Sequence, residues 1–156
     1  MSIEIRSPTE YLLVEVIDKC LTITLNRPEA LNSLRPEMLE GIHTLVQQAD
    51  QSEEISVVVL QGSGRAFSAG VDLKVLQGID PKAGKIGDVF DKPAEKAWET
   101  LRDSRCPIIA KVHGACFTGA LEMALHCDFI LTTVCLLYTS DAADEGLGVD
   151  LGGRRI

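Results

Sequence analysis

The chain has 156 residues, which is about the length of one domain. Hydrophobic residues make up 46% of it, which is enough for a buried core and excludes a disordered, purely solvating segment. The formal charge of −8 argues against nucleic acid as a partner, because phosphate backbones bind basic surfaces. A small anionic ligand remains compatible with this charge, because such a ligand responds to local charge.

The cysteines and the N-terminus indicate the compartment. The five cysteines are widely spaced and form no CxxC pair or zinc-like cluster; they are Cys20, Cys106, Cys116, Cys127 and Cys135. This spacing favours buried free thiols in a reducing compartment over disulfides. The N-terminus lacks a signal sequence, and no apolar run reaches the ~18 residues of a membrane span. We therefore expect a soluble, cytoplasmic protein without membrane contact.

The first predicted elements are two short β-prone runs at residues 12–17 and 20–25. Apolar residues alternate with threonines in the second run, which predicts a hairpin with one solvated face. The segment LNRPEALNSL then interrupts regular structure. Pro36 suits the first turn of a helix, and the apolar residues after it recur every three or four positions. This spacing predicts an amphipathic helix to about Ala49.

Three later apolar runs, at residues 55–62, 107–114 and 128–133, predict strands of a parallel sheet. Each run is short and continuously apolar, so we expect other elements to cover both of its faces. Helices are predicted between the strands, around Lys92–Ser104 and Gly119–Leu125. Within the first of these helices, Trp98 and Leu101 are predicted to anchor it to the core. The alternation predicts an α/β layered domain with right-handed crossovers.

Two segments are interpreted as lying outside this pattern. Residues 78–92 contain three glycines, a proline and mixed charges, which favours a mobile surface loop or a lid. From about Cys135 the alternation of helices and strands is lost, and the sequence resembles a translated sequencing-adapter read-through. We therefore interpret residues 1–134 as the domain and 135–156 as a non-native tail. A native C-terminal tail is the alternative.

One candidate site element is the loop Ser63–Lys74, which follows a predicted strand. Gly70 removes the side chain that would block a tight turn there. The backbone amide of Val71 can then point outward at a ligand. An ordinary strand-to-helix turn is the alternative interpretation.

The loop at residues 113–128 is a second candidate of the same kind. The unpaired amides and the positive helix end at Gly119 favour an anion or oxyanion site. Glu122 follows in the first helical turn, either as an ordinary helix-start acid or as a general acid–base. Two outward amides and a carboxylate together could stabilise an enolate while moving a proton.

At these residues the chain resembles the crotonase superfamily, the enoyl-CoA hydratase/isomerases. The resemblance runs from about residue 14 to 133 and includes LNRPEALNSL, AFSAGVDLK and PIIAKVHGACFTGALEMALHCDF in this order. It implies a layered β-sheet with crossover helices, built on a ββα repeat. The family commonly has three glycines where this chain has Thr118, Gly119 and Ala120. The family's second catalytic glutamate and C-terminal helical region have no counterpart here, so we interpret the chain as the N-terminal part of a longer enzyme.

The resemblance also implies roles for individual residues. The backbone amides of Val71 and Gly119 would hold the thioester oxygen, and Glu122 would be the catalytic carboxylate. Lys74 would lie near the CoA phosphates. The other residues implied in substrate or CoA binding are Glu29, Ala30, Leu31, Ala69, Gly70, Asp72 and Leu73.

The function implied by the resemblance is hydration of a 2-enoyl-CoA. The substrate would be an acyl-CoA thioester, with CoA as its handle and no metal or other cofactor. Isomerisation of a 3-enoyl-CoA and a non-catalytic CoA-binding paralogue are the alternatives. The resemblance further implies a homo-oligomer, a trimer or hexamer, for the full-length protein. We expect the 156-residue chain by itself to be inactive.

Other residues with reactive side chains are weaker candidates. His113 and His126 lie at predicted strand and helix ends, where structural roles are favoured. His43 lies on the polar side of its helix and is expected to be solvated. Cys116 has no evident base to make it a nucleophile. Asp72 could be a base, but an acid after such a turn more often fixes the loop by accepting backbone hydrogen bonds.

Overall fold

The protein is described by a computed structural model that covers residues 5–77 and 88–133. A single sheet contains five strands in chain order, with β1 and β2 antiparallel and the remaining neighbours parallel. The strands are β1 (Leu12–Ile17), β2 (Cys20–Leu25), β3 (Val57–Gly62), β4 (Ile108–Val112) and β5 (Phe129–Thr132). The predicted hairpin and the three predicted parallel strands are thereby confirmed.

The hairpin turn has only two residues, Asp18 and Lys19, and both have positive φ angles of 49° and 64°. This is the backbone of a type I′ turn, whose twist matches that of the two strands it joins. It sets the register in which Leu12 lies opposite Leu25. That register places the buried side chains of both strands on the same face.

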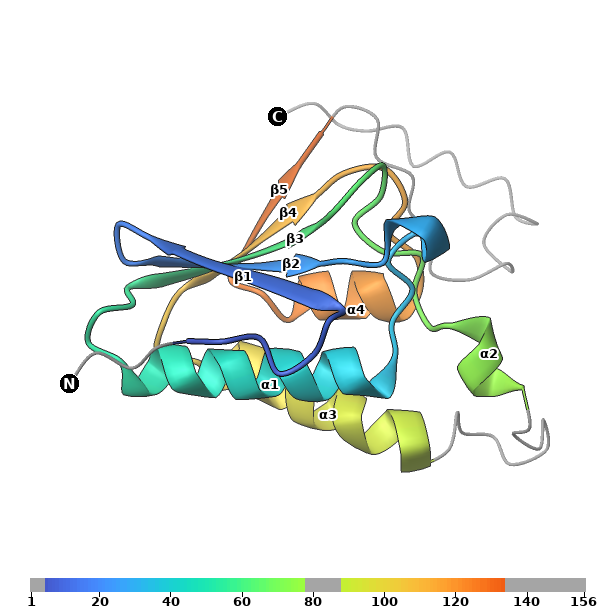
Figure 1. The fold of residues 1–156 in the computed structure, drawn as a ribbon, viewed down its shortest axis with the longest axis horizontal. Helices are drawn as coiled ribbons and strands as arrows, with labels where there is room; N and C mark the ends of the chain where they lie inside the picture. The colour runs from blue at the N-terminus through green and yellow to red at the C-terminus, as the bar shows by residue number, and fades with distance from the viewer. Residues whose placement is uncertain (1–4, 78–87, 134–156) are drawn as a thin grey trace.

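Three helices lie on one side of the sheet (Figure 1). They are α1 (Pro36–Gln51), α3 (Asp88–Asp103) and α4 (Gly119–Leu125). The predicted helix after Pro36 is confirmed, and so is the one at residues 119–125. Two shorter elements have no apolar period in the sequence: η1 (Pro28–Ala30), and α2 (Leu73–Leu76), which begins at the end of the first candidate loop. Elements of three or four residues are too short to show a hydrophobic period.

The core lies between the sheet and these helices. Leu21, Ile23 and Leu25 of β2 are fully buried on the helical side, where the apolar stripe of α1 faces them. That stripe consists of Met38, Leu39, Ile42, Leu45, Val46 and Ala49, all fully buried. Each large aliphatic side chain removed from water in this way contributes about 1.5–3 kcal/mol. Burial of this stripe therefore orients α1 on the sheet.

The expectation that β3, β4 and β5 would be covered on both faces is wrong for the described residues. In β3, Val58 and Leu60 are buried, but Val57 and Val59 on the other face are only half-buried. β5 is exposed along its whole length. The continuous apolar runs therefore include side chains on a face that no described helix covers.

The predicted loop at residues 78–92 needs a second correction. Residues 78–87 lie outside the described residues, but residues 88–92 belong to α3, which begins four residues before the predicted Lys92. Phe90 and Ala94 continue the buried spacing of Trp98 and Leu101 toward the N-terminus of the helix. Pro93 and the preceding glycines concealed this period in the sequence.

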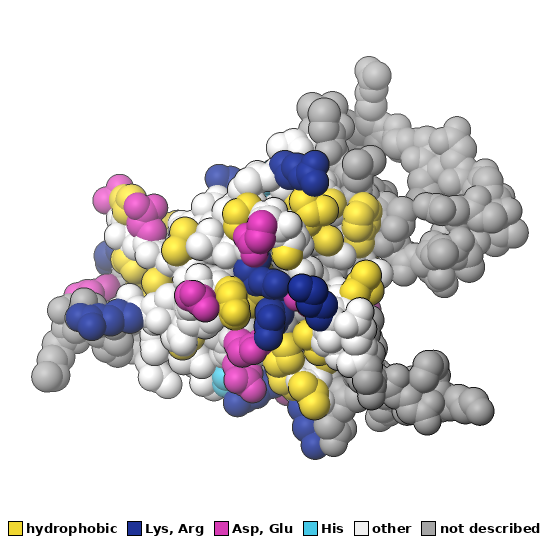
Figure 2. All heavy atoms as spheres, turned by 45° about the vertical axis from the view of Figure 1, so that its right-hand side comes forward, with side chains coloured by type: hydrophobic (Ala, Val, Ile, Leu, Met, Phe, Trp, Pro, Cys, Tyr) yellow, Lys and Arg dark blue, Asp and Glu magenta, His cyan; other side chains and the backbone are white. Residues whose placement is uncertain are grey.

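Charges of both signs lie on one face of the molecule. On the face seen in Figure 2, Lys and Arg side chains lie near the centre, with acidic and hydrophobic side chains close around them. The chain, whose formal charge is −8, therefore carries positive side chains interspersed with negative ones on this face. Within the described ranges, no helix is both long enough and apolar enough to cross a membrane.

The remaining sequence expectations concern thiols and the tail. Cys20, Cys106, Cys116 and Cys127 are free thiols, as predicted. Cys106 and Cys116 are buried, as expected, whereas Cys20 and Cys127 are only half-buried. Cys135 and the proposed tail at 135–156 lie outside the described residues.

Candidate active site

The two candidate loops are joined by backbone hydrogen bonds just beyond β3 and β4. The amide of Phe67 donates to the carbonyl of His113 at 2.7 Å, and that of Ser68 donates to Ala115 at 3.1 Å. The amide of Phe117 returns a bond to Ser68 at 3.2 Å. The two segments therefore continue side by side after the strands end, as a short parallel bridge between Ser68 and Cys116.

Gly70 forms the tight turn predicted for the first loop. Its φ angle is +87°, a conformation that is costly for residues with a Cβ atom. A Cβ at this position would overlap Oγ1 of Thr118 and would lie 2.6 Å from the carbonyl oxygen of Phe117. The absence of a side chain therefore lets the first turn pack directly against the second.

The amide of Val71 is free. Leu34 pairs with this turn by donating to the carbonyl of Gly70 at 2.7 Å and accepting from the amide of Asp72 at 2.9 Å. This parallel pairing uses the groups on either side of Val71 and leaves its own N–H without a partner among the described residues. The predicted outward amide is thus present.

The amide of Gly119 is free in the same sense. Gly119 is the first residue of α4, and the helix begins with bonds from Ala120 to Phe117 at 2.9 Å and from Glu122 to Thr118 at 3.0 Å. No described group accepts a hydrogen bond from the Gly119 N–H. A Cβ added to Gly119 would lie 3.5 Å from Cγ2 of Val71. The two free amides therefore belong to turns that touch.

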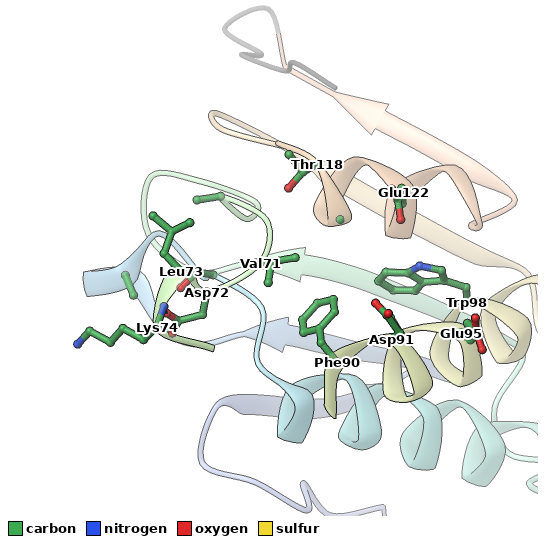
Figure 3. Close-up of a pocket in the computed structure, with 15 residues that line it drawn as sticks. Val71, Asp72, Leu73, Lys74, Phe90, Asp91, Glu95, Trp98, Thr118 and Glu122 are labelled. Atoms are coloured by element: carbon green, nitrogen blue, oxygen red, sulfur yellow. The ribbon is translucent and has the colours of Figure 1, made fainter. Parts of the chain in front are cut away.

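Both turns border a pocket of about 750 Å³. Eight of the predicted residues line it, namely Ala30, Ala69, Val71, Asp72, Leu73, Lys74, Gly119 and Glu122. Figure 3 shows Glu122 pointing from α4 into this space, with the Val71 turn on a neighbouring wall. The sequence motifs, far apart in the chain, thus meet at one cavity.

Three predicted residues do not line the pocket. Glu29 is exposed on η1, and Gly70 is buried beneath the turn. Leu31 is half-buried, and its carbonyl accepts a hydrogen bond from the amide of Ala69 at 2.9 Å. Leu31 therefore ties η1 to the first turn through its backbone.

Asp72 holds the first turn in place. It is 6% exposed, and its Oδ1 accepts a hydrogen bond from the amide of Lys74 at 3.0 Å. Its Oδ2 pairs with Nη1 of Arg27 at 2.9 Å. Burial opposes the charged form, but the Lys74 amide and the Arg27 guanidinium outweigh it and lower the pKa of Asp72. This is the loop-fixing role favoured from the sequence, and a carboxylate with a lowered pKa is a poor base.

Asn32 is an organising residue that the sequence analysis missed. It is fully buried with a φ angle of +54°, which asparagine tolerates better than most residues. Its side-chain amide donates to the carbonyls of Ser63 and Ala66, each at 2.8 Å. Its Oδ1 accepts from the amide of Arg27 at 2.8 Å. Only its position within the LNRPEALNSL motif could have indicated this role.

Helix α3 supplies a further wall of the pocket. Phe90, Asp91, Glu95 and Trp98 line it, and Asp91 and Glu95 add carboxylates to the one from Glu122. Trp98 was predicted as a core anchor; it is buried but also reaches the cavity. Phe90 and Asp91 were missed because they fell in the predicted surface loop.

The histidines and Cys116 have structural roles. His113 Nε2 contacts the carbonyl of Gly64 at 2.9 Å, and His126 Nδ1 contacts that of Glu122 at 2.8 Å. Both findings fit the structural roles favoured above. Cys116 is fully buried, and this burial raises the pKa of its thiol to about 11, so it is not a thiolate nucleophile.

The expectation that His43 would be solvated is wrong. Its side chain is half-buried between α1 and α3, where Nδ1 lies 2.6 Å from Oγ1 of Thr100. Burial, with a smaller contribution from Lys96, lowers the pKa of His43. The helix face that seemed polar in the sequence is the contact with α3. No group of three or more potential metal ligands occurs in the described part of the chain.

Comparison with known proteins agrees with this geometry. Residues 17–147 match the family described as enoyl-CoA hydratase/isomerase. The chain belongs to this family. Members of the enoyl-CoA hydratase/isomerase family are therefore the reference for its fold.

Individual relatives and structures are similar over most of this chain. A probable enoyl-CoA hydratase of Rhizobium meliloti is 34% identical over 146 residues, which are 94% of this chain and 55% of the relative. The human mitochondrial 3-hydroxyisobutyryl-CoA hydrolase is 30% identical, over 92% of this chain and 38% of its own length. The structure of Pseudomonas aeruginosa DspI has a TM-score of 0.78 at 31% identity, covering 88% of this chain and 55% of DspI. The crotonase-type fold is thus confirmed, and the chain spans about half the length of the first of these relatives.

Proposed function

We propose that this chain supplies the acyl-CoA site of a 2-enoyl-CoA hydratase. The observation that carries the proposal is the meeting of two unpaired amides, those of Val71 and Gly119, at one pocket with the carboxylate of Glu122. Converging N–H groups suit an oxygen atom that gains negative charge during a reaction. The thioester oxygen of an acyl-CoA becomes such an atom when the α,β double bond is attacked.

In the proposed reaction, the thioester oxygen accepts hydrogen bonds from both amides. Glu122 orients a water molecule and takes its proton as the water oxygen bonds to C3. The electrons of the C2–C3 double bond move onto the thioester as an enolate. C2 then takes up the proton that Glu122 removed from the water, so that one water molecule has been added across the double bond and Glu122 is a carboxylate again. Each oxyanion donor in such a site typically contributes ~2.7–4 kcal/mol to transition-state stabilisation. The reaction uses no cofactor, since CoA is part of the substrate.

The CoA portion is proposed to lie along η1 and the start of α2. Ala30 and Lys74 line the same pocket as the amides, and Lys74 is exposed. Lys74 provides local positive charge for the CoA phosphates, although the chain as a whole is acidic. We further propose that the whole protein is a cytoplasmic homo-oligomer, a trimer or hexamer, without nucleic acid or membrane partners.

The experiment uses an extended protein, in which residues 1–133 are followed by the corresponding C-terminal part of the Rhizobium meliloti relative. Loss of the conjugated thioester absorbance of a 2-enoyl-CoA measures turnover. We expect the Glu122→Gln variant to retain acyl-CoA binding but to lose ~10²–10⁴-fold in turnover, the usual contribution of a positioned proton-transfer group. Glu95→Gln is the matched control, because Glu95 also lines the pocket but has no proposed catalytic role.

Three outcomes distinguish the alternatives. Near wild-type kinetics for Glu122→Gln would remove Glu122 from the mechanism. Faster conversion of a 3-enoyl-CoA than of a 2-enoyl-CoA would favour the isomerase. Tight acyl-CoA binding by the folded extended protein, with neither activity, would favour a CoA-binding paralogue. The 156-residue chain is expected to bind weakly and to give no turnover, because positioning of reactants fails when part of a pocket is missing.

A further inference from the structure

Thr118 has an unfavourable backbone conformation at the edge of the pocket. Its φ and ψ angles are 45° and −118°, a combination that glycine adopts readily and a β-branched residue does not. A strained residue of this kind costs stability and persists only where the surrounding structure imposes it. Such residues are often found at functional sites. Glycine at this position would avoid the strain, so we expect the threonine side chain to have a role that glycine could not fill.

The side chain does not have the usual role of a threonine that precedes a helix. In that position the hydroxyl oxygen normally accepts a hydrogen bond from an amide of the first turn. The Thr118 side chain makes no such bond to α4, and it has no hydrogen-bond partner elsewhere among residues 5–77 and 88–133. Its hydroxyl group is therefore available to a ligand.

The hydroxyl group lies against the turn that carries the Val71 amide. Oγ1 of Thr118 packs on Gly70 so closely that a Cβ on Gly70 would overlap it. Gly70 directly precedes the amide of Val71, and Thr118 directly precedes the amide of Gly119. Thr118 is exposed and lines the pocket, and Figure 3 shows it at the start of α4, beside the turn that carries Val71.

We propose that the Thr118 hydroxyl is a third hydrogen-bond donor to the thioester oxygen. The inference rests on the proposed function, since it needs an acyl-CoA carbonyl at the Val71 and Gly119 amides. A hydroxyl group can rotate to donate to an oxygen that already accepts two N–H bonds. Such a donor stabilises the enolate more than the neutral thioester, because the negative charge develops on this oxygen.

The test compares three substitutions in the extended protein described above, because the 156-residue chain by itself is expected to bind acyl-CoA only weakly. Thr118→Ser keeps the hydroxyl, Thr118→Val keeps the shape and the strain without it, and Thr118→Gly removes both the hydroxyl and the strain. The probe is a cinnamoyl thioester of CoA, whose absorbance moves to longer wavelength when its carbonyl oxygen accepts hydrogen bonds. Free CoA and the free thioester give the reference spectra.

We expect the wild type and Thr118→Ser to give the full wavelength shift. Thr118→Val and Thr118→Gly should give a smaller shift and about three- to tenfold weaker binding, the usual effect of one net hydrogen bond. Thr118→Gly should also raise the midpoint of thermal unfolding by about 3 °C, because it relieves the strained φ angle. Thr118→Val should leave that midpoint near the wild-type value, so loss of the shift cannot be ascribed to unfolding.

Each other outcome overturns a defined step. A full shift in Thr118→Val would show that the hydroxyl does not contact the carbonyl, and the inference would fail while the proposed function stood. A lower unfolding temperature for Thr118→Gly would show that threonine is the structurally preferred residue and would remove the reason for a functional role. Absence of any shift or binding in the folded extended protein that carries Thr118 would overturn the proposed function and this inference with it.

Discussion

The two turns that present the free amides are held in different ways. The Val71 turn is fixed by buried side chains, because Asp72 and Arg27 form an ion pair there and Ser68 Oγ accepts a hydrogen bond from the Gly70 amide at 3.1 Å. The Gly119 turn has no cap from Thr118 and relies on backbone bonds to the first turn.

We infer that the Val71 turn, called the first turn, is the more rigid of the two and that it sets the position of the second turn at Gly119. The ion pair of the first turn is 11% and 8% exposed, so its hydrogen bonds compete little with water. The second turn takes its position from contact with the first and leads into α4, which carries Glu122. Disturbing the first turn should therefore affect both amides, whereas disturbing the second should affect only one.

The largest expected effect comes from Arg27→Ala. It leaves Asp72 as a buried carboxylate without its cation, which should lower the free energy of unfolding by about 3–5 kcal/mol. Arg35→Ala is the matched control, because both guanidinium groups lie over the ring of Tyr11, at 5.4 and 5.5 Å from its centre. Within the described part of the chain, the ion pair of Arg35 is with exposed Glu37, so its loss should cost less than about 1 kcal/mol. Equal losses in urea unfolding would show that the buried ion pair is not what fixes the first turn.

The next effect separates the two turns directly. Gly70→Ala introduces a Cβ at a φ angle of +87° and against the Phe117 carbonyl, which should cost about 2–4 kcal/mol of folding free energy. Gly119→Ala places a Cβ at an ordinary 3.5 Å from Val71 and should change stability by less than about 1 kcal/mol. Thermal unfolding of both variants measures the contrast. A smaller loss for Gly70→Ala than for Gly119→Ala would reverse the proposed order of rigidity.

Local patterns predicted much of this arrangement. The hairpin, the parallel strands and α1 follow from apolar spacing, and the turn at Gly70 follows from its small residues after a strand. The pairing of Arg27 with Asp72 does not follow from spacing, because the two residues are 45 positions apart and meet only when the fold forms. Asp91 was missed because glycines and a proline nearby obscured the start of α3.

In the candidate site, too, the residues in local motifs could be predicted, whereas the contacts between distant segments could not. Val71, Gly119 and Glu122 could be predicted because each belongs to a motif with a recognisable local shape. The strained backbone of Thr118 could not, since a sequence gives residue types but not the φ angle that neighbouring turns impose. The third donor proposed above therefore depends on the three-dimensional contact with Gly70.

The smallest expected effect concerns pH and again tests the first turn. The Arg27 ion pair and the Lys74 amide keep the pKa of Asp72 below its ordinary value of 3.8 despite burial. A depressed folded-state pKa adds stability that is complete above the ordinary value and is lost as pH falls through the folded-state value. Stability should thus be insensitive to Asp72 titration between pH 7 and about 5 and should decline below about pH 4.

Asp72→Asn removes this titration, so its unfolding free energy should fall less steeply than that of the wild type over the acid range. Glu37→Gln is the exposed comparison: the pKa of Glu37 is also lowered, by a backbone hydrogen bond and by Arg35, but the group is exposed, so its curve should flatten less than that of Asp72→Asn. If the unfolding free energies of the wild type and Asp72→Asn fell in parallel with pH, Asp72 would not be held as a charged group. The proposal that the Val71 turn is more rigid than the Gly119 turn would then be wrong.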